Sequence, residues 1–326
     1  MKVLVTGGAG YVGSVSVEAL LAAGHEAVVL DDLSTGHLGS LPSTVSVVRG
    51  SVGDRQGVRE LLERERIDAV LHCAARSLVG ESVAEPAKYY RENVAGGFAL
   101  LDAMRAGGVG RLVFSSSAAV YGVPEATPIP EDAPLRPVNP YGETKRAFEA
   151  ALHWYGGAYG LRSISLRYFN AAGATERSGE DHDPETHLVP NVLAAALGRH
   201  ELVVFGDDYP TPDGTAIRDY IHVADLADAH LLALEATGSG EEADVYNLGS
   251  GRGFSVREVI DAAERIVGRE IPRTVGPRRS GDPPILVAAA ARAQDVLGWR
   301  PRRGTLEEMI GSAWAWRRAH PDGYRG

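Results

Sequence analysis

The sequence predicts an α/β protein, with a doubly wound parallel sheet followed by a smaller C-terminal α/β domain. Short β-branched runs alternate with helical stretches through the first 170 residues, and a glycine-rich segment joins the first run to the first helix. After Asn170 the pattern becomes polar, proline-bearing and irregular. Strands that alternate with helices form a parallel sheet covered by helices on both faces.

The first domain, expected over residues 1–170, holds roughly six strand-like runs. They cover residues 2–6, 27–30, 45–49, 69–73, 111–115 and 163–169. Residues 11–23 have helical spacing, 55–66 form a charged helical stretch, and further helices are expected near 84–105 and 141–159. Each run is thus joined to the next by a helix or loop, and parallel pairing is expected.

A second domain is expected over residues 171–326, where shorter elements follow the polar segment 171–189. Strand-like pieces at 217–223 and 245–248 could pair with either domain. Short segments near 217–250 are therefore expected to return to the first domain.

Composition is that of an ordinary globular protein. The chain has 326 residues, 44% of them hydrophobic, and no apolar run approaches the roughly 18 residues that span a membrane. The net charge of −10 and the scattered basic residues argue against non-specific nucleic-acid binding. We expect a cytoplasmic protein with no nucleic-acid or membrane partner.

Cysteine and histidine usage predicts neither a disulfide nor a metal site. The single cysteine, Cys73, lies in the apolar run 69–75 and is expected to be a small core residue. The ten histidines are dispersed, and His182 and His187 fall in a polar loop where surface or substrate contacts are expected.

Glycines 7, 10 and 13 form a G-x-x-G-x-x-G segment between the first strand and the first helix. Gly7 permits a tight turn, Gly10 lets the backbone approach a pyrophosphate, and Gly13 allows close packing of helix on strand. Asp31 ends the second strand, where a carboxylate can accept hydrogen bonds from ribose hydroxyls and repel a 2′-phosphate. With Asp32 adding to that effect, the pattern indicates a Rossmann-type domain that binds NAD rather than NADP.

Tyr141 and Lys145 lie one helical turn apart at the start of a predicted helix. A phenol is a poor base at neutral pH, but a nearby ammonium favours the phenolate. Ser117 follows the fifth strand, at the carboxyl edge of the sheet, and can bond a reacting hydroxyl. The sequence therefore predicts a Ser-Tyr-Lys catalytic set.

Six runs together resemble the UDP-glucose 4-epimerases of the extended short-chain dehydrogenase/reductase family, and they span nearly the whole chain. They are TGGAGYVG (6–13), FSSSAAVYG (114–122), NPYGETK (139–145), RYFNAAGA (167–174), RDYIHVADLA (218–227) and RRSGDPP (278–284).

The resemblance implies that bound NAD oxidises the sugar at C4 and that hydride returns to the opposite face of a transient 4-keto sugar. UDP-galactose and UDP-glucose would interconvert, with Tyr141 as the base, Lys145 tuning it and Ser117 orienting the hydroxyl. It also implies a homodimer that pairs the helices at 84–105 and 141–159.

The implied site has two sides. On the cofactor side lie Gly7, Gly10, Tyr11, Val12, Gly13, Asp31, Asp32, Ser51, Val52, Cys73, Ala74, Ala75, Asn93, Tyr141, Lys145 and Tyr168. On the substrate side lie Ser117, Tyr141, Phe169, Asn170, His187, Leu188, Phe205, Arg218, Tyr220, Arg279, Asp282 and Leu286.

Three positions depart from the resemblance or bear on specificity. Ser51 stands where an aspartate commonly faces the adenine, and Arg76 stands where a lysine is usual near the pyrophosphate. Leu286 aligns with a position beside C2 of the sugar where a tyrosine excludes an N-acetyl group, so some turnover of UDP-N-acetylglucosamine is expected.

Three alternatives remain. The chain could epimerise another UDP-sugar, either UDP-N-acetylglucosamine or a UDP-pentose. A sugar-nucleotide dehydratase would need an Asp-Glu pair after the serine-bearing strand, where Ser116, Ser117 and Ala118 stand instead. A non-enzymatic dinucleotide sensor would not need Tyr141 or Lys145.

Overall fold

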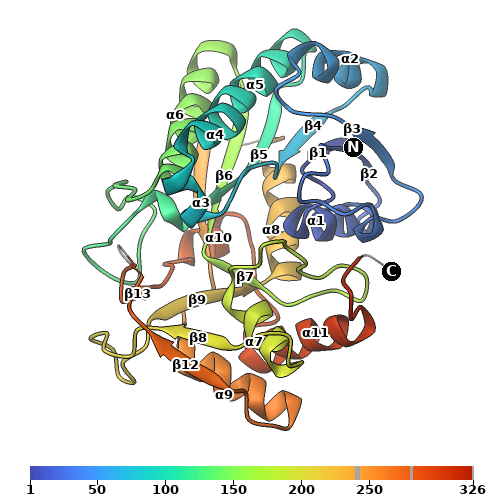
Figure 1. Ribbon diagram of the computed structural model, residues 1–326. Coiled ribbons are helices and arrows are strands. Elements are labelled where there is room, and N and C mark those ends of the chain that lie inside the picture. Colours follow the sequence, from blue (N-terminus) through green and yellow to red (C-terminus); the bar gives the residue numbers. More distant parts are fainter. Residues whose placement is uncertain (239–242, 280–281, 325–326) are drawn as a thin grey trace.

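Seven parallel strands form the large sheet of the computed structural model, which describes residues 1–238, 243–279 and 282–324 (Figure 1). Their order is β10-β6-β5-β4-β1-β2-β3. The strands are β1 (Lys2–Thr6), β2 (Glu26–Asp31), β3 (Ser46–Arg49), β4 (Ala69–His72), β5 (Arg111–Ser117), β6 (Arg162–Tyr168) and β10 (Ala243–Leu248). The predicted doubly wound α/β sheet is confirmed, with β10 as a strand beyond the six expected.

Helices cover both faces of this sheet because its strands are apolar on both sides. In β1, Val3 and Val5 face one core and Leu4 faces the other. One face packs against α1 (Tyr11–Ala22), α8 (Val223–Ala236) and α10 (Ala291–Val296). The opposite face packs against α2 (Arg55–Glu65), α5 (Gly96–Ala106) and α6 (Pro140–Tyr159).

The chain reverses its direction of winding between β1 and β4, which are hydrogen-bonded neighbours. Crossovers from β1 lead outward to β2 and β3, and those from β4 lead the other way to β5 and β6. A parallel sheet of this kind opens a crevice at the carboxyl ends of its strands at such a reversal. A ligand site is therefore expected above Thr6 and His72.

The long helix predicted near 84–105 is confirmed from Pro86 to Ala106, where α4 (Pro86–Tyr89), a wider π-helical stretch (Tyr90–Ala95) and α5 follow one another without a break. A short separate helix, α3 (Val79–Ala84), precedes it. Pro86 starts a new helix because proline lacks the N–H that a continuing helix would use. The π-helical stretch contains the buried Asn93, and such turns are frequent at functional sites.

The smaller domain packs two short sheets against helices below the large sheet (Figure 1). One contains β7 (Asn170–Ala172), β9 (Ile217–His222), β11 (Gly253–Ser255) and β13 (Ile285–Leu286); the other contains β8 (Leu202–Phe205) and β12 (Arg273–Gly276). Its core includes residues of α7 (Leu188–Ala196), α9 (Val256–Val267) and α11 (Leu306–Ala319).

The two strand-like pieces at 217–223 and 245–248, whose pairing the sequence left open, join different sheets. The first becomes β9 and pairs with β7, β11 and β13 of the smaller domain, whereas the second lies within β10 and pairs with β6. Between them α8 lies against the large sheet. Within the described residues, no helix has the length and apolar character needed to cross a membrane.

Candidate active site

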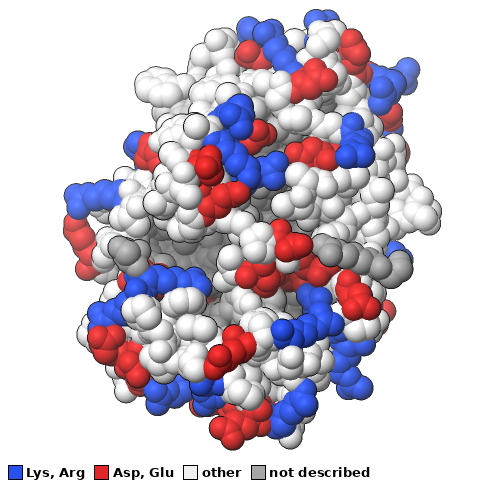
Figure 2. Space-filling model, in the orientation of Figure 1, with Lys and Arg blue, Asp and Glu red and all other residues white. Residues whose placement is uncertain are grey.

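A cavity of about 730 Å³ lies between the large sheet and the smaller domain. Figure 2 shows the hollow between the upper and lower parts of the molecule, with acidic and basic side chains interspersed around it. Every residue predicted on the cofactor side lines this cavity. So do Ser117, Phe169, Asn170, His187, Arg279, Asp282 and Leu286 from the substrate side.

The glycine segment closes one end of the cavity at the start of α1. Gly7 has a φ of +69°, and a Cβ on Gly13 would lie 2.1 Å from the carbonyl oxygen of Gly7. Both positions therefore require glycine. Gly10 is the N-cap of α1 and brings no capping side chain, so the amide groups of the first turn remain available to an anion.

Asp31 both fixes the glycine segment and faces the cavity. Its Oδ2 accepts from the backbone N–H of Ala9 at 2.9 Å, and its Oδ1 accepts from that of Leu33 at 2.8 Å. Burial raises the pKa of the Asp31 carboxyl, and these two backbone donors oppose the rise. Next to it, Arg76 Nη2 lies 3.5 Å from Asp32 Oδ2. Arg76, which stands where the family usually has a lysine, therefore forms an ion pair at the cavity wall.

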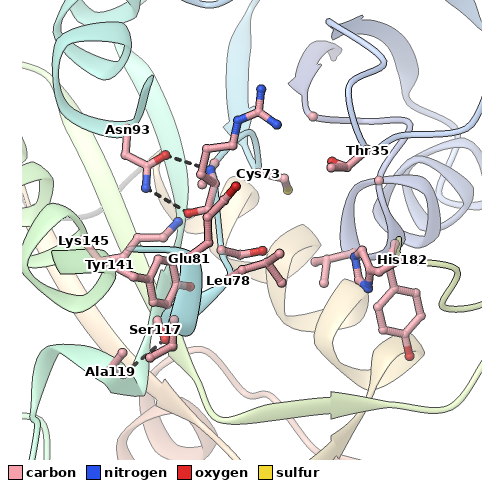
Figure 3. Close-up of a pocket in the computed structure, with 18 of the residues that line it drawn as sticks. Thr35, Cys73, Leu78, Glu81, Asn93, Ser117, Ala119, Tyr141, Lys145 and His182 are labelled. Atoms are coloured by element: carbon pink, nitrogen blue, oxygen red, sulfur yellow. Dashed lines mark hydrogen bonds between the residues drawn. The ribbon is translucent and has the colours of Figure 1, made fainter. Parts of the chain in front are cut away.

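Asn93 holds the turn that follows β4 (Figure 3). Its Oδ1 accepts from the backbone N–H of Arg76 at 2.8 Å, and its Nδ2 donates to the carbonyl oxygen of Arg76 at 2.9 Å and to Thr144 Oγ1 at 3.1 Å. One buried amide thus joins the cavity wall to α6, the helix that carries Tyr141 and Lys145. Its role here is positional.

Tyr141 and Lys145 project side by side from the first turns of α6 toward Ser117 (Figure 3). Asn139 caps this helix by accepting from the N–H of Gly142 at 2.8 Å, and Pro140 occupies the first helical position. Lys145 Nζ lies 5.8 Å from the centre of the Tyr141 ring and donates to the carbonyl oxygen of Ser115 at 2.7 Å. The predicted catalytic set therefore meets at one point of the cavity.

Burial controls the protonation of this set. It lowers the pKa of Lys145 to about 8, and it raises the pKa of Tyr141, against the opposing effect of the Ser117 hydroxyl. The protein alone therefore leaves Tyr141 a weaker acid than a free phenol. Any group that brings positive charge to the cavity shifts Tyr141 toward the phenolate.

The sequence profile of the NAD dependent epimerase/dehydratase family matches residues 3–249. The chain belongs to this family. A UDP-glucose 4-epimerase of Streptomyces lividans is 52% identical over 325 residues, covering 99% of this chain and 98% of the relative. One of Lacticaseibacillus casei is 48% identical over 327 residues, covering 99% of each chain. The crystal structure of the Brucella ovis UDP-glucose 4-epimerase in complex with NAD has a TM-score of 0.93 at 48% identity, covering 96% and 97% of the two chains.

NAD is the cofactor of this epimerase/dehydratase family, and the cavity suits it. The uncapped start of α1 offers backbone donors to a pyrophosphate, and the Asp31 carboxylate stands at the end of β2 where a ribose hydroxyl can donate to it. Ser51 also lines the cavity. It has a hydroxyl and no charge, and its Oγ accepts from the N–H of Gly53 at 3.1 Å.

On the predicted substrate side, one guanidinium, that of Arg279, lines the cavity. Arg218 Nη2 lies 2.5 Å from Asp282 Oδ1, and the Arg279 guanidinium lies 4.3 Å from the centre of the exposed Phe205 ring. Arg218 and Phe205 do not line the cavity, whereas their partners Asp282 and Arg279 do. Two residues of the RRSGDPP run, Ser280 and Gly281, lie outside the described residues.

Tyr220 and Leu188 also lie outside the cavity lining. Tyr220 is 3% exposed and packs in the core of the smaller domain, and Leu188 is partly buried against the same core. Cys73 lines the cavity beside β4, where burial raises the pKa of its thiol to about 11. A thiol with that pKa is no nucleophile at neutral pH.

One group of polar residues at the cavity was not predicted. Glu180, His182, Glu185 and His187 lie close together, and three of the four line the cavity. Their spacing, Glu-x-His-x-x-Glu-x-His, was the available signal. The two histidines alone do not carry this signal, which needs Glu180 before them and Glu185 between them.

Proposed function

We propose that this chain is a UDP-glucose 4-epimerase that interconverts UDP-galactose and UDP-glucose. The observation that carries the proposal is the position of Tyr141, Lys145 and Ser117 in a single cavity. A dinucleotide-type glycine segment lines the same cavity, and so does Asp282, the ion-pair partner of Arg218. The solved UDP-glucose 4-epimerase of Thermotoga maritima with UDP-glucose, 31% identical to this chain, supports the substrate.

Bound NAD supplies a hydride acceptor that returns the hydride to the substrate. Tyr141 takes the proton of the sugar 4-hydroxyl and gives a proton back when the hydroxyl re-forms. Lys145 adds positive charge beside the phenol, and Ser117 orients the reacting oxygen. Because the oxidised sugar is used inside the site, no net redox partner is needed.

The test is to give purified protein UDP-galactose, without added NAD, and to measure UDP-glucose by chromatography. Formation of UDP-glucose, which differs from UDP-galactose by inversion at C4, supports the proposal. A 4-keto-6-deoxy product would indicate dehydration instead, and binding without any turnover would indicate a dinucleotide sensor.

A homodimer is part of the proposal. The outer surface of α5 and α6 exposes large apolar side chains, with Phe98 at 38%, Trp154 at 72% and Tyr159 at 57% exposure. Pairing these helices across a two-fold axis would bury them. Sedimentation at micromolar concentration should give twice the 34.6 kDa of one chain, and Trp154→Glu should weaken the association. We also propose that the enzyme works in the cytoplasm, which cell fractionation would test.

A further inference from the structure

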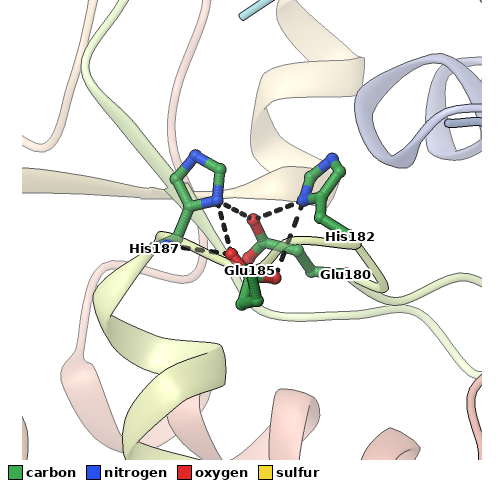
Figure 4. A group of neighbouring side chains, drawn as sticks. All are labelled: Glu180, His182, Glu185 and His187. Carbon is green, nitrogen blue, oxygen red and sulfur yellow. Dashed lines mark hydrogen bonds and ion pairs between the residues drawn. The ribbon is translucent and has the colours of Figure 1, made fainter. Parts of the chain in front are cut away.

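Four potential metal ligands converge beside the cavity, in the loop that leads into α7 (Figure 4). We call them the 180–187 cluster: Glu180, His182, Glu185 and His187. One ligand atom from each lies within 4.8 Å of every other. Figure 4 shows a nitrogen of each imidazole turned toward the two carboxylates. We propose that the 180–187 cluster binds one divalent cation of the zinc type.

The separations fit four ligands around one ion. His182 Nδ1 lies 3.3 Å from Glu180 Oε1 and 3.7 Å from Glu185 Oε2. His187 Nδ1 lies 2.8 Å from Glu180 Oε1. Zinc bonds of 2.0–2.2 Å in a tetrahedron place ligand atoms about 3.3–3.6 Å apart. Since the ligand atoms lie up to 4.8 Å apart, the widest separation would have to shorten by about 1.2–1.5 Å to complete the coordination.

Hydrogen bonding within the cluster leaves ligand atoms unused. His182 Nδ1 and Glu185 Oε2 are buried and make no hydrogen bond, whereas Glu185 Oε1 accepts from the backbone N–H groups of Thr186 and His187, at 2.8 Å each. Buried polar atoms that make no hydrogen bond are rare and call for a reason. These two lie 3.7 Å apart, within ion-pair range, and a cation between them would give each a closer partner.

Charge and ligand chemistry favour zinc over the harder cations. Two carboxylates balance one divalent ion when both imidazoles bind as neutral ligands. Nitrogen ligands suit zinc and its neighbours in the transition series, whereas calcium and magnesium prefer oxygen alone. With four protein ligands the site would be closed, as structural zinc sites are, and the ion would have no open position for a substrate oxygen.

The surroundings already hold the ligands in place. Arg317 Nη2 of α11 donates to the backbone oxygen of Glu180 at 2.8 Å, and Asn191 Nδ2 of α7 donates to that of His187 at 2.8 Å. The His182 ring packs edge-on against Tyr11 of α1, with 6.5 Å between ring centres. An ion here would link a cavity wall to helices of both domains.

The competing arrangement is an ion-pair cluster without metal. Burial lowers the pKa of His182, but Glu180 and Glu185 outweigh it and raise the pKa to about 9. Protonated imidazoles would then balance the carboxylates without any cation. The two arrangements differ in whether the protein binds metal with defined stoichiometry.

The experiment uses full-length protein with its affinity tag removed. After treatment with chelator and gel filtration, the protein is titrated with ZnCl₂ by calorimetry, and its metal content is measured by mass spectrometry. We expect one zinc per chain and a rise in unfolding temperature with zinc, because a ligand that binds only the folded state stabilises it. Cobalt(II) should give the intense visible bands of four-coordinate cobalt.

His182→Gln and Glu185→Gln should each weaken zinc binding by at least about 10- to 100-fold, while circular dichroism shows the fold retained. His153→Gln, which changes an exposed histidine of α6 outside the cluster, is the matched control and should bind zinc normally. Wild-type protein that binds neither zinc nor cobalt at micromolar concentration would overturn the proposal, as would equal losses in control and cluster variants. Metal content, calorimetry and cobalt spectra do not involve turnover, so they test the zinc site independently of the epimerase activity.

Discussion

Replacing Tyr141 by phenylalanine tests the proposed chemistry at a single atom. The change deletes one oxygen from a side chain in the first turn of α6 and leaves the aromatic ring in place. The helix start does not depend on that oxygen, since Asn139 caps the helix and Thr144 Oγ1 donates to the Tyr141 backbone oxygen at 2.8 Å. The variant should fold as the wild type does.

The expected loss of turnover follows from the role of the phenol. A positioned general base contributes about 10²- to 10⁴-fold, which corresponds to roughly 2.7–5.4 kcal/mol of barrier. Lys145 and Ser117 remain in the variant, so binding should change less than turnover. We therefore expect Tyr141→Phe to lower kcat with little change in KM.

The assay measures UDP-galactose turnover together with the dinucleotide released on denaturation. Tyr155→Phe is the matched control, because Tyr155 lies on the same helix and its hydroxyl approaches Asp102 Oδ1 at 3.3 Å, away from the cavity. The control should keep wild-type turnover. Turnover of Tyr141→Phe within about tenfold of wild type would remove Tyr141 as the base, and loss of bound NAD would make its role cofactor binding instead.

Three further perturbations test the rest of the site. Burial lowers the pKa of Lys145 in the folded protein to about 8, from an ordinary value of 10.5. Between these two pH values the unfolded chain binds more protons than the folded one, so the stability of the folded state rises with pH. Thermal unfolding of wild type and Lys145→Met should therefore show the wild type gaining stability relative to the variant from about pH 8 to 10.5. Asp31→Asn keeps one acceptor for the N–H groups of Ala9 and Leu33 and loses the charge, so it should retain less NAD and discriminate less against NADP in equilibrium dialysis. Leu286→Tyr narrows the cavity wall and should lower the rate ratio of UDP-N-acetylglucosamine to UDP-glucose; an unchanged ratio would mean that this position does not control sugar size.

The residues near the large sheet could be predicted because local pattern and chain order determine their places. A parallel strand ends where its apolar run ends, so Asp31 and Ser117 had to emerge at the same edge of the sheet. Tyr141 and Lys145 follow from one helical turn and one capping asparagine. Each of these positions depends on a few neighbouring residues.

The smaller domain could not be predicted in the same way. Its sheets join segments far apart in sequence: β13 pairs with β9 across more than sixty residues, and only that pairing puts Leu286 beside Arg218. Arg218, Phe205, Leu188 and Tyr220 were predicted from resemblance alone, and the cavity lining omits all four. Short irregular elements carry too little periodicity to show which face of each strand is buried.

A buried hydrogen-bond network connects β5 with α6 and β6, and it bears on which reaction the site can carry out. Ser116 Oγ donates to Glu149 Oε1 at 2.5 Å, and Arg167 Nη2 pairs with Glu149 Oε2 at 2.6 Å, with both charged side chains buried. Arg167 Nη1 also donates to the hydroxyl of Tyr121 at 2.8 Å. Breaking such a pair by removing one partner costs about 3–5 kcal/mol, because it leaves a buried charge uncompensated.

The Arg167–Glu149 pair explains why a carboxylate next to β5 does not make the site a dehydratase. Glu149 lies beneath Ser116, outside the cavity lining, and both of its oxygens are bonded to Arg167. Elimination of water requires an acid and a base that can reach the sugar. The Glu149 carboxylate instead fixes β5 against α6 and β6, which holds Ser117 and Tyr141 at one point of the cavity. The proposed epimerisation needs no further carboxylate, because Tyr141, Lys145 and Ser117 handle the proton and the cofactor accepts and returns the hydride.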